Sequence, residues 1–187
     1  MNYAMVHEVV GYHGTDSGCV SSILTENFKI SAGEDEWLGH GVYLFTEGVS
    51  CPIQNAVEWA KNQAYSRKGN RYHSYTVLEA TARCSKLLDL RTTEGISAFD
   101  TVRKKILEKH DEHFARSRRI QNDNRVMWNL VAQMMSLEVI IHNLYIKNRI
   151  QRIRKIDSNV PNTTVMCVKD PDSIAVETIK VFASGAV

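Results

Sequence analysis

The hydrophobic pattern of the chain predicts strands near both of its ends. Short apolar or β-branched runs that stop at glycine or at turn residues are typical of buried strands. Four such runs occur in the first half of the sequence, at residues 8–13, 42–45, 74–82 and 87–90. Two more follow near the C-terminus, at 163–168 and 176–182, separated by a Lys-Asp-Pro-Asp-Ser sequence that has the composition of a turn.

Apolar residues three and four positions apart predict helices between these strands. This spacing occurs at residues 18–27 and again from Pro52 to Tyr65, where Ser50 and Pro52 are helix-start signals. Together, the strands and helices predict an α+β fold.

The middle of the chain is predicted to be mostly helical, from Ser97 to Ile156. Ser97 has the features of an N-cap, with Asp100 three residues later where Glu is more usual. The apolar stretch 126–146 is long enough to suit a bilayer, but four polar residues interrupt it: Asn129, Gln133, His142 and Asn143. Because these groups would be costly in hydrocarbon, we predict a buried amphipathic helix.

Length and composition indicate one compact domain over residues 1–187, with a helical insertion at about 97–156. The net charge of +2 argues neither for nor against a nucleic-acid partner. The four cysteines form no CxxC pair and have no histidine at ligand spacing, so we expect reduced thiols and no metal site. The N-terminus lacks the basic start and apolar run of a secretion signal, which predicts a cytoplasmic protein without membrane contact.

Two short motifs carry candidate chemistry, Tyr12-His13-Gly14-Thr15 and, about thirty residues later, Gly39-His40-Gly41-Val42-Tyr43. A histidine at a strand end beside glycine offers a ligand both an imidazole and an uncrowded backbone. A tyrosine flanked by glycines can lay its ring against a flat heterocycle. Taken singly, each residue has an ordinary explanation, as a half-buried histidine or a core aromatic.

Taken together with Trp37-Leu38 before the second motif and the alanine-rich helix after it, His13 and Tyr43 resemble the H-Y signature of the poly(ADP-ribose)-polymerase-like ADP-ribosyltransferases. The resemblance is good over residues 9–90, weaker over 163–182, and absent from the helical stretch between them. It implies split antiparallel β-sheets with flanking helices, and NAD as a substrate without a metal.

The resemblance also implies roles for individual residues. His13 would bond the adenine-side ribose, the backbone of Gly14 would hold the nicotinamide carboxamide, and Tyr43 would stack on the nicotinamide ring. Thr15 would lie beside this site, and Ser50 or Cys51 near a further nicotinamide contact.

A third family position, often Glu and in some bacterial relatives Gln, falls on Val165 when counted back from Ile174. A carboxylate there stabilises the positive charge that develops on the ribose. A register shifted by a residue would put Thr163 or Thr164 beside the ribose instead. Glu138 and Glu177 are the other candidate carboxylates, although both have the pattern of ordinary surface charges. Relatives with an aliphatic third residue transfer a single ADP-ribose or are inert.

Basic residues gather in the helical stretch, with few acids between them: Arg116, Arg118, Arg119, Lys147, Arg149, Arg152, Arg154 and Lys155. They form either a solvated helix face or a surface that follows a phosphate backbone. Because this stretch is not part of the family resemblance, it is where the choice of acceptor would be encoded.

The sequence thus predicts a mono-ADP-ribosyltransferase that modifies a macromolecule, with RNA ahead of DNA and protein as the next candidate. An NAD glycohydrolase and a catalytically silent NAD or ADP-ribose binding module are the alternatives. Small bacterial relatives with this signature are often toxins, paired with an antitoxin or serving in defence against phage; by analogy, the same role is expected here.

Overall fold

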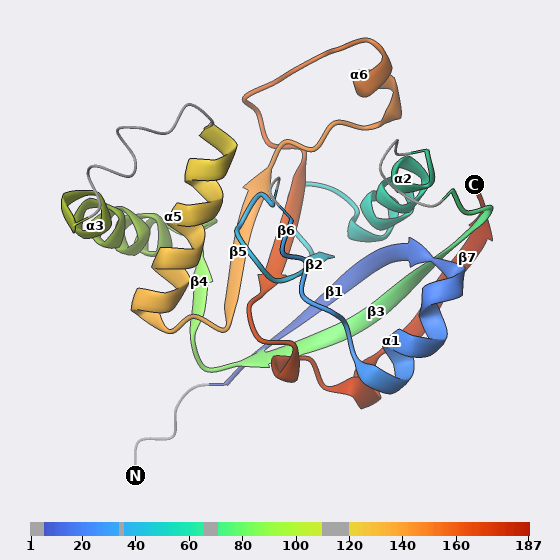
Figure 1. The fold of residues 1–187 in the computed structure, drawn as a ribbon, viewed down its shortest axis with the longest axis horizontal. Helices are drawn as coiled ribbons and strands as arrows, with labels where there is room; N and C mark the ends of the chain where they lie inside the picture. The colour runs from blue at the N-terminus through green and yellow to red at the C-terminus, as the bar shows by residue number, and fades with distance from the viewer. Residues whose placement is uncertain (1–5, 34–35, 66–70, 110–119) are drawn as a thin grey trace.

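The structure is a computed structural model that describes residues 6–33, 36–65, 71–109 and 120–187. The described strands form one seven-stranded sheet in the order β4-β5-β6-β2-β1-β3-β7 (Figure 1). Neighbouring strands are antiparallel except for β4 and β5, which are parallel. The strands are β1 (His7–Asp16), β2 (Val42–Phe45), β3 (Ser74–Cys84), β4 (Leu87–Asp89), β5 (Val139–Leu144), β6 (Thr163–Val168) and β7 (Lys180–Ala186). The predicted α+β class is confirmed.

The helices lie around this sheet. They are α1 (Val20–Glu26), α2 (Pro52–Ala64), α3 (Thr93–Lys109), α5 (Ile120–Met135) and α6 (Arg149–Ile153), with short 3-10 turns at Ser17–Cys19, Pro171–Ser173 and Val176–Thr178. Helix α2 packs on β1 and β3, while α3 and α5 pack on each other beside β4. The chain around α6 projects from the rest of the molecule (Figure 1).

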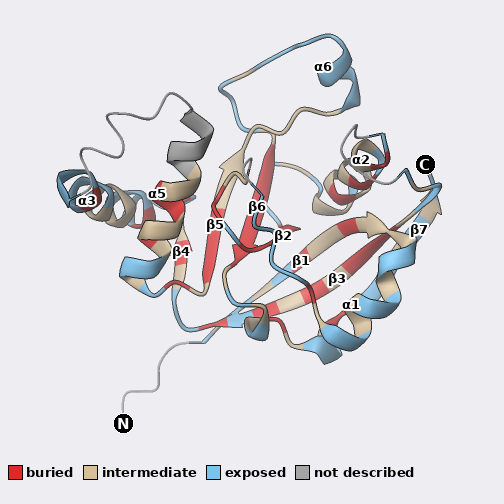
Figure 2. Cartoon of the chain, in the orientation of Figure 1, coloured by how far each residue is buried: buried red, intermediate tan, exposed pale blue. Residues whose placement is uncertain are grey.

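Two hydrophobic clusters cover opposite faces of the central strands. Because side chains alternate along a strand, Phe45 and Val165 join the cluster beneath α2, α3 and α5, whereas Leu44 and Met166 join the cluster that contacts α1. All six residues of β6 are buried as a result (Figure 2). A strand covered on both faces has a continuous apolar sequence without alternation.

This continuous apolar pattern explains one wrong prediction, that residues 126–146 are all helix. Helix α5 ends at Met135, Ser136 adopts a φ of 52°, and the chain continues as strand β5 between β4 and β6. An apolar run of this kind does not reveal whether it is a helix or a fully buried strand. The segment 97–156 is therefore not a purely helical insertion, because it supplies a central strand.

Three element boundaries also differ from prediction by three residues or more. Strand β1 does not stop at His13 but continues to Asp16, because residues 13–16 pair with β3. Helix α3 begins at Thr93 and not at Ser97, because the Thr92 hydroxyl already accepts a hydrogen bond from the Gly95 N–H at 3.0 Å. The last strand begins at Lys180, since Val176–Thr178 forms a 3-10 turn. In contrast, β2 and β6 have the predicted bounds. In the part of the chain that the structure describes, no helix is both long and apolar enough to cross a membrane.

Gly14 allows α2 to lie directly on β1. A Cβ atom at this position would stand 1.9 Å from the Ala56 carbonyl oxygen and 3.1 Å from the Ala60 Cβ. We expect Gly14→Ala to lower the free energy of unfolding by about 1–3 kcal/mol through overpacking, and the melting temperature by roughly 2–12 °C. Thermal unfolding checks this.

Gly18→Ala is the matched control for that measurement, because a Cβ atom there meets nothing closer than 3.5 Å. If Gly14→Ala has the same melting temperature as the wild-type protein, α2 does not pack on β1 as described.

Candidate active site

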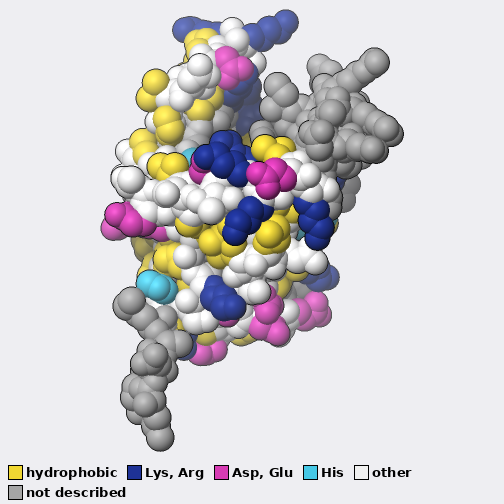
Figure 3. All heavy atoms as spheres, turned by 90° about the vertical axis from the view of Figure 1, so that its left-hand side faces the viewer, with side chains coloured by type: hydrophobic (Ala, Val, Ile, Leu, Met, Phe, Trp, Pro, Cys, Tyr) yellow, Lys and Arg dark blue, Asp and Glu magenta, His cyan; other side chains and the backbone are white. Residues whose placement is uncertain are grey.

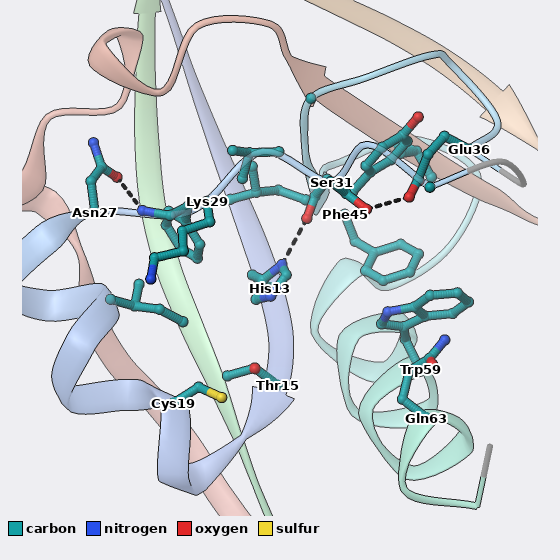
Figure 4. A pocket seen from close by; sticks show the side chains of 18 of the residues that line it. His13, Thr15, Cys19, Asn27, Lys29, Ser31, Glu36, Phe45, Trp59 and Gln63 are labelled. Atoms are coloured by element: carbon teal, nitrogen blue, oxygen red, sulfur yellow. Dashed lines mark hydrogen bonds between the residues drawn. The ribbon is translucent and has the colours of Figure 1, made fainter. Parts of the chain in front are cut away.

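A cavity of about 860 Å³ opens where β1 and β2 diverge. The register between these two strands contains a single pair, Tyr12 with Phe45. The cavity is lined from β1, α1, the loop before β2, β2 itself, α2 and β6 (Figure 4). Its size falls within the range of ligand sites, about 300–1,000 Å³.

His13 lies at the centre of this cavity, half-buried on β1 (Figure 4). Its Nδ1 lies 2.8 Å from the Tyr43 carbonyl oxygen. Because a carbonyl only accepts, Nδ1 carries the proton and Nε2 of the neutral ring is an acceptor. Burial lowers the pKa of His13, although the bond to Tyr43 partly opposes that shift. The Phe28 ring stands edge-on at 5.1 Å and fixes the imidazole from another side.

Tyr43 also lines the cavity, and its hydroxyl is fully engaged by the preceding loop. The hydroxyl donates to the Gly39 carbonyl at 2.6 Å and accepts from the Leu38 N–H at 2.8 Å. Burial raises the pKa of this phenol, so it stays protonated. The Trp37 ring stands edge-on to Tyr43 at 6.2 Å and to Trp59 at 5.1 Å. These rings form an aromatic wall on the side of the cavity away from α1.

The loop that carries Trp37 is held from beneath by two distant side chains. The half-buried Lys169 ammonium donates to the carbonyls of Leu38 and His40, the latter at 2.9 Å, and desolvation lowers its pKa. The Asn129 side chain accepts from the His40 N–H at 2.8 Å. Gly39, at a φ of 75°, is the residue that permits this close approach. Lys169 and Asn129 lie 129 and 89 residues from His40 in the sequence. No local pattern links them to the motif, so they could not be predicted from it.

Gly14 and Thr15 follow His13 on β1; Thr15 lines the cavity, whereas Gly14 is not among the lining residues. The Val10 carbonyl accepts from the Thr46 hydroxyl at 2.7 Å, so it faces the β2 side of β1. Backbone groups of alternate residues in an antiparallel strand point the same way. The N–H and C=O of Gly14 therefore face the side on which β2 diverges.

Ser50 and Cys51 do not line this cavity. The Ser50 hydroxyl donates to the Asn162 carbonyl at 2.8 Å and accepts from Asn55 at the same distance, in a smaller adjoining cavity. Cys51 is exposed at the N-cap of α2. Both residues therefore lie at the start of α2, outside the cavity that His13 and Tyr43 line.

Val165 forms part of the cavity wall and is only 2% exposed. It is paired with Phe45 on β2 and with His142 on β5. The neighbouring threonines are occupied: Thr163 accepts from Asn55 at 2.8 Å, and Thr164 donates to Asn143 at 2.7 Å. The structure thus brings Val165 to the same cavity as His13 and Tyr43.

The two carboxylates considered from sequence lie elsewhere. Glu138 accepts from the backbone N–H groups of Ser85 at 2.6 Å and Lys86 at 3.1 Å, and these bonds lower its pKa. Glu177 is exposed and lies 3.7 Å from Arg83. The carboxylate that does line the described cavity belongs to Glu36, which accepts from the Ser31 hydroxyl (Figure 4). Sequence reasoning missed it, because the acidic run around it has the pattern of a solvated loop.

The basic residues divide into several groups. Arg116, Arg118 and Arg119 lie outside the described residues. Basic side chains of the projecting chain gather at the top of the molecule (Figure 3). Lys147 pairs with Asp157 at 2.9 Å, whereas Arg149 and Arg152 line a groove of about 400 Å³ against the end of α2. Arg154 and Lys155 do not line that groove.

Comparison with known proteins finds no family model that matches this chain and no significant match among curated proteins. Over the described ranges, no group of three or more His, Cys, Asp or Glu side chains gathers in a way that would hold a metal ion.

Proposed function

We propose that this protein is an NAD-dependent ADP-ribosyltransferase whose one sheet is split at the cavity, where β1 and β2 keep a single residue pair. It transfers a single ADP-ribose to a nucleic acid, with single-stranded RNA ahead of DNA. The observation that carries the proposal is the meeting of His13 and Tyr43, from the two motifs, at one cavity of about 860 Å³. Their hydrogen bond at 2.8 Å joins the two diverging strands.

The polar groups of the cavity suit a dinucleotide. The Nε2 atom of His13 accepts a hydrogen bond from a ribose hydroxyl, since Nδ1 is committed to the Tyr43 carbonyl. Beside the cavity, on the edge of β1 from which β2 diverges, the backbone of Gly14 offers one donor and one acceptor, which match the two halves of a carboxamide. The aromatic wall of Trp37, Tyr43 and Trp59 presents ring surface to the nicotinamide.

Glu36 supplies the negative charge that Val165 does not. During transfer, the bond between ribose C1′ and the nicotinamide nitrogen breaks, and its electron pair remains on that nitrogen, so nicotinamide leaves uncharged. Positive charge develops on the ribose and is stabilised by a nearby carboxylate. A nucleophilic atom of the acceptor then bonds C1′ and releases its proton to the Glu36 carboxylate.

The biological setting follows by analogy with small bacterial relatives of the same signature. We propose a cytoplasmic toxin, neutralised by an antitoxin or used in defence against phage. Modification of an RNA by one bulky, charged ADP-ribose would block its pairing or translation.

Labelled NAD tests the proposed function. The purified protein is incubated with NAD labelled in the adenylate part and with RNA, single-stranded DNA or total protein. Label that nuclease removes and protease does not is the expected result. Label that only protease removes makes the acceptor a protein, and nicotinamide release without any label makes the enzyme a glycohydrolase. If the protein binds NAD but neither labels a macromolecule nor releases nicotinamide, it is a catalytically silent binding module.

A carboxylate at position 165 is expected to raise NAD cleavage by up to about 100-fold, the size of a single electrostatic contribution to catalysis. The same change should lower the melting temperature, because Val165 is 2% exposed and burial of a charge is costly. Nicotinamide release by Val165→Glu, compared with Val165→Gln, measures the effect of the charge. Equal turnover in both variants would mean that position 165 does not face the ribose.

A further inference from the structure

A groove beside the cavity combines two guanidinium groups with an exposed aromatic ring. It has a volume of about 400 Å³, and its lining comes from the end of α2 and from α6: Asn62, Gln63, Tyr65, Arg149, Arg152 and Ile153. No carboxylate is among these described lining residues. The groove is therefore suited to a negatively charged ligand.

Tyr65 and Arg149 form the most distinctive pair in this groove. The Arg149 guanidinium lies 4.7 Å from the centre of the Tyr65 ring and covers one of its faces. Tyr65 nevertheless remains 53% exposed, and Ile153 beside it is 71% exposed. An exposed ring backed by a guanidinium is the arrangement on which unpaired bases stack.

The α6 segment is built to present these residues. Asn148 caps the helix, accepting from the Gln151 N–H at 2.9 Å, while the Gln151 side chain accepts from the Asn148 N–H at 3.0 Å. The Arg152 Nε donates to the Lys147 carbonyl at 2.8 Å, which leaves its terminal nitrogens as further donors. Short as it is, α6 holds Arg149 and Arg152 on the side that faces α2.

Helix α2 connects the groove to the NAD cavity. Gln63 lines both, and Trp59, which lines the NAD cavity, stands one helical turn before it. From Trp59 to Tyr65 the helix rises roughly 9 Å, a span that one or two nucleotides cover. A strand lying in the groove can thus reach the cavity without rearrangement of either element.

We propose that this groove binds the acceptor as a single-stranded RNA, with backbone phosphates on Arg149 and Arg152 and a base stacked on Tyr65. The inference rests on the proposed function and specifies how its acceptor is held. It also separates the basic residues of this segment, because Arg154 and Lys155 lie outside the groove.

The test measures three quantities for each variant: the affinity for NAD, the affinity for a labelled single-stranded RNA oligonucleotide, and the transfer of label from NAD to that RNA. Arg149→Gln with Arg152→Gln should lower RNA labelling at least about tenfold. It should also reduce the slope of log K for RNA binding against log salt concentration by about 1.4, for two lost phosphate contacts. Tyr65→Ala should weaken RNA binding about 5-fold to 150-fold, as the loss of one stacked base does. The affinity for NAD should not change.

Arg103→Gln with Lys105→Gln is the matched control, since it removes two positive charges from exposed positions of α3, a helix that lines neither the cavity nor the groove. It should leave RNA labelling within about twofold of wild type. Arg154→Gln with Lys155→Gln should have a smaller effect than the groove variant. An equal loss in this pair or in the α3 pair would overturn the groove as the acceptor site.

The test also separates failure of the groove from failure of the proposed function. Wild-type protein that does not bind NAD contradicts the proposed function. Wild-type protein that labels RNA, while the groove variants label it equally well, contradicts only the groove. Label found solely in protein overturns the groove as an RNA site.

Discussion

Replacing His13 by asparagine should weaken NAD binding about 5-fold to 150-fold, which corresponds to roughly 1–3 kcal/mol for a lost hydrogen bond in a cavity. The amide nitrogen of asparagine takes the place of Nδ1, so the bond that His13 makes to the Tyr43 carbonyl at 2.8 Å is retained. The Nε2 acceptor disappears. The variant therefore isolates the contact to the ribose from the contact that joins the two strands.

Calorimetric titration with NAD measures this loss, and thermal unfolding verifies that the fold is intact. His40→Asn is the matched control, because His40 belongs to the second motif but is exposed and does not line the cavity. Replacing His13 by alanine removes both hydrogen bonds and should lower NAD affinity and stability together. Normal titration of His13→Asn would exclude this cavity as the NAD site.

The fold was predictable where the pattern of side chains reflects one exposed and one buried face, or where an apolar run is bounded by glycines. Strand β2 is of the second kind, with Gly41 before it and Gly48 after it, and its bounds were predicted correctly. Strand β5 was not, because both of its faces are buried and its apolar sequence continues that of helix α5. Long-range pairing with β4 and β6, which no local window contains, makes it a strand.

For the candidate site, the sequence predicted which residues come together at the cavity, while their roles stay predictions. His13, Tyr43 and Val165 stand out in short motifs or by counting from a turn, and all three line one cavity. Lys169 and Asn129, which hold the loop before Tyr43, could not be found in this way. Their importance arises from contacts between segments that are distant in sequence, and each would be taken for an ordinary polar residue.

The structure also changes the interpretation of Gly14. In the sequence, Gly14 indicates an open backbone for a ligand. The structure adds a packing requirement, since the Ala56 carbonyl occupies the place of a side chain. The two roles are compatible, because the backbone groups of Gly14 lie at the edge of β1 while α2 covers its face.

Replacing Glu36 by glutamine should lower the rate of nicotinamide release about 100-fold to 1,000-fold, the cost of removing one electrostatic group from a transition state. Glutamine has nearly the same shape and still accepts a hydrogen bond from the Ser31 hydroxyl, so the loop should keep its conformation. Only the negative charge is lost. Because that charge acts on the cation that develops during bond breaking, the affinity for intact NAD should remain within about threefold of wild type.

Single-turnover release of nicotinamide, measured together with the dissociation constant for NAD, separates the chemical step from binding. Glu177→Gln is the matched control, since Glu177 is an exposed carboxylate that pairs with Arg83 and does not line the cavity. A variant carrying both Glu36→Gln and Val165→Glu should recover part of the lost rate, because the second carboxylate approaches the same cavity from β6. If Glu36→Gln releases nicotinamide as fast as the wild-type protein does, Glu36 has no part in the mechanism. If the wild-type protein itself shows no turnover, the proposed mechanism is wrong, and the NAD site is then judged by the His13→Asn titration alone.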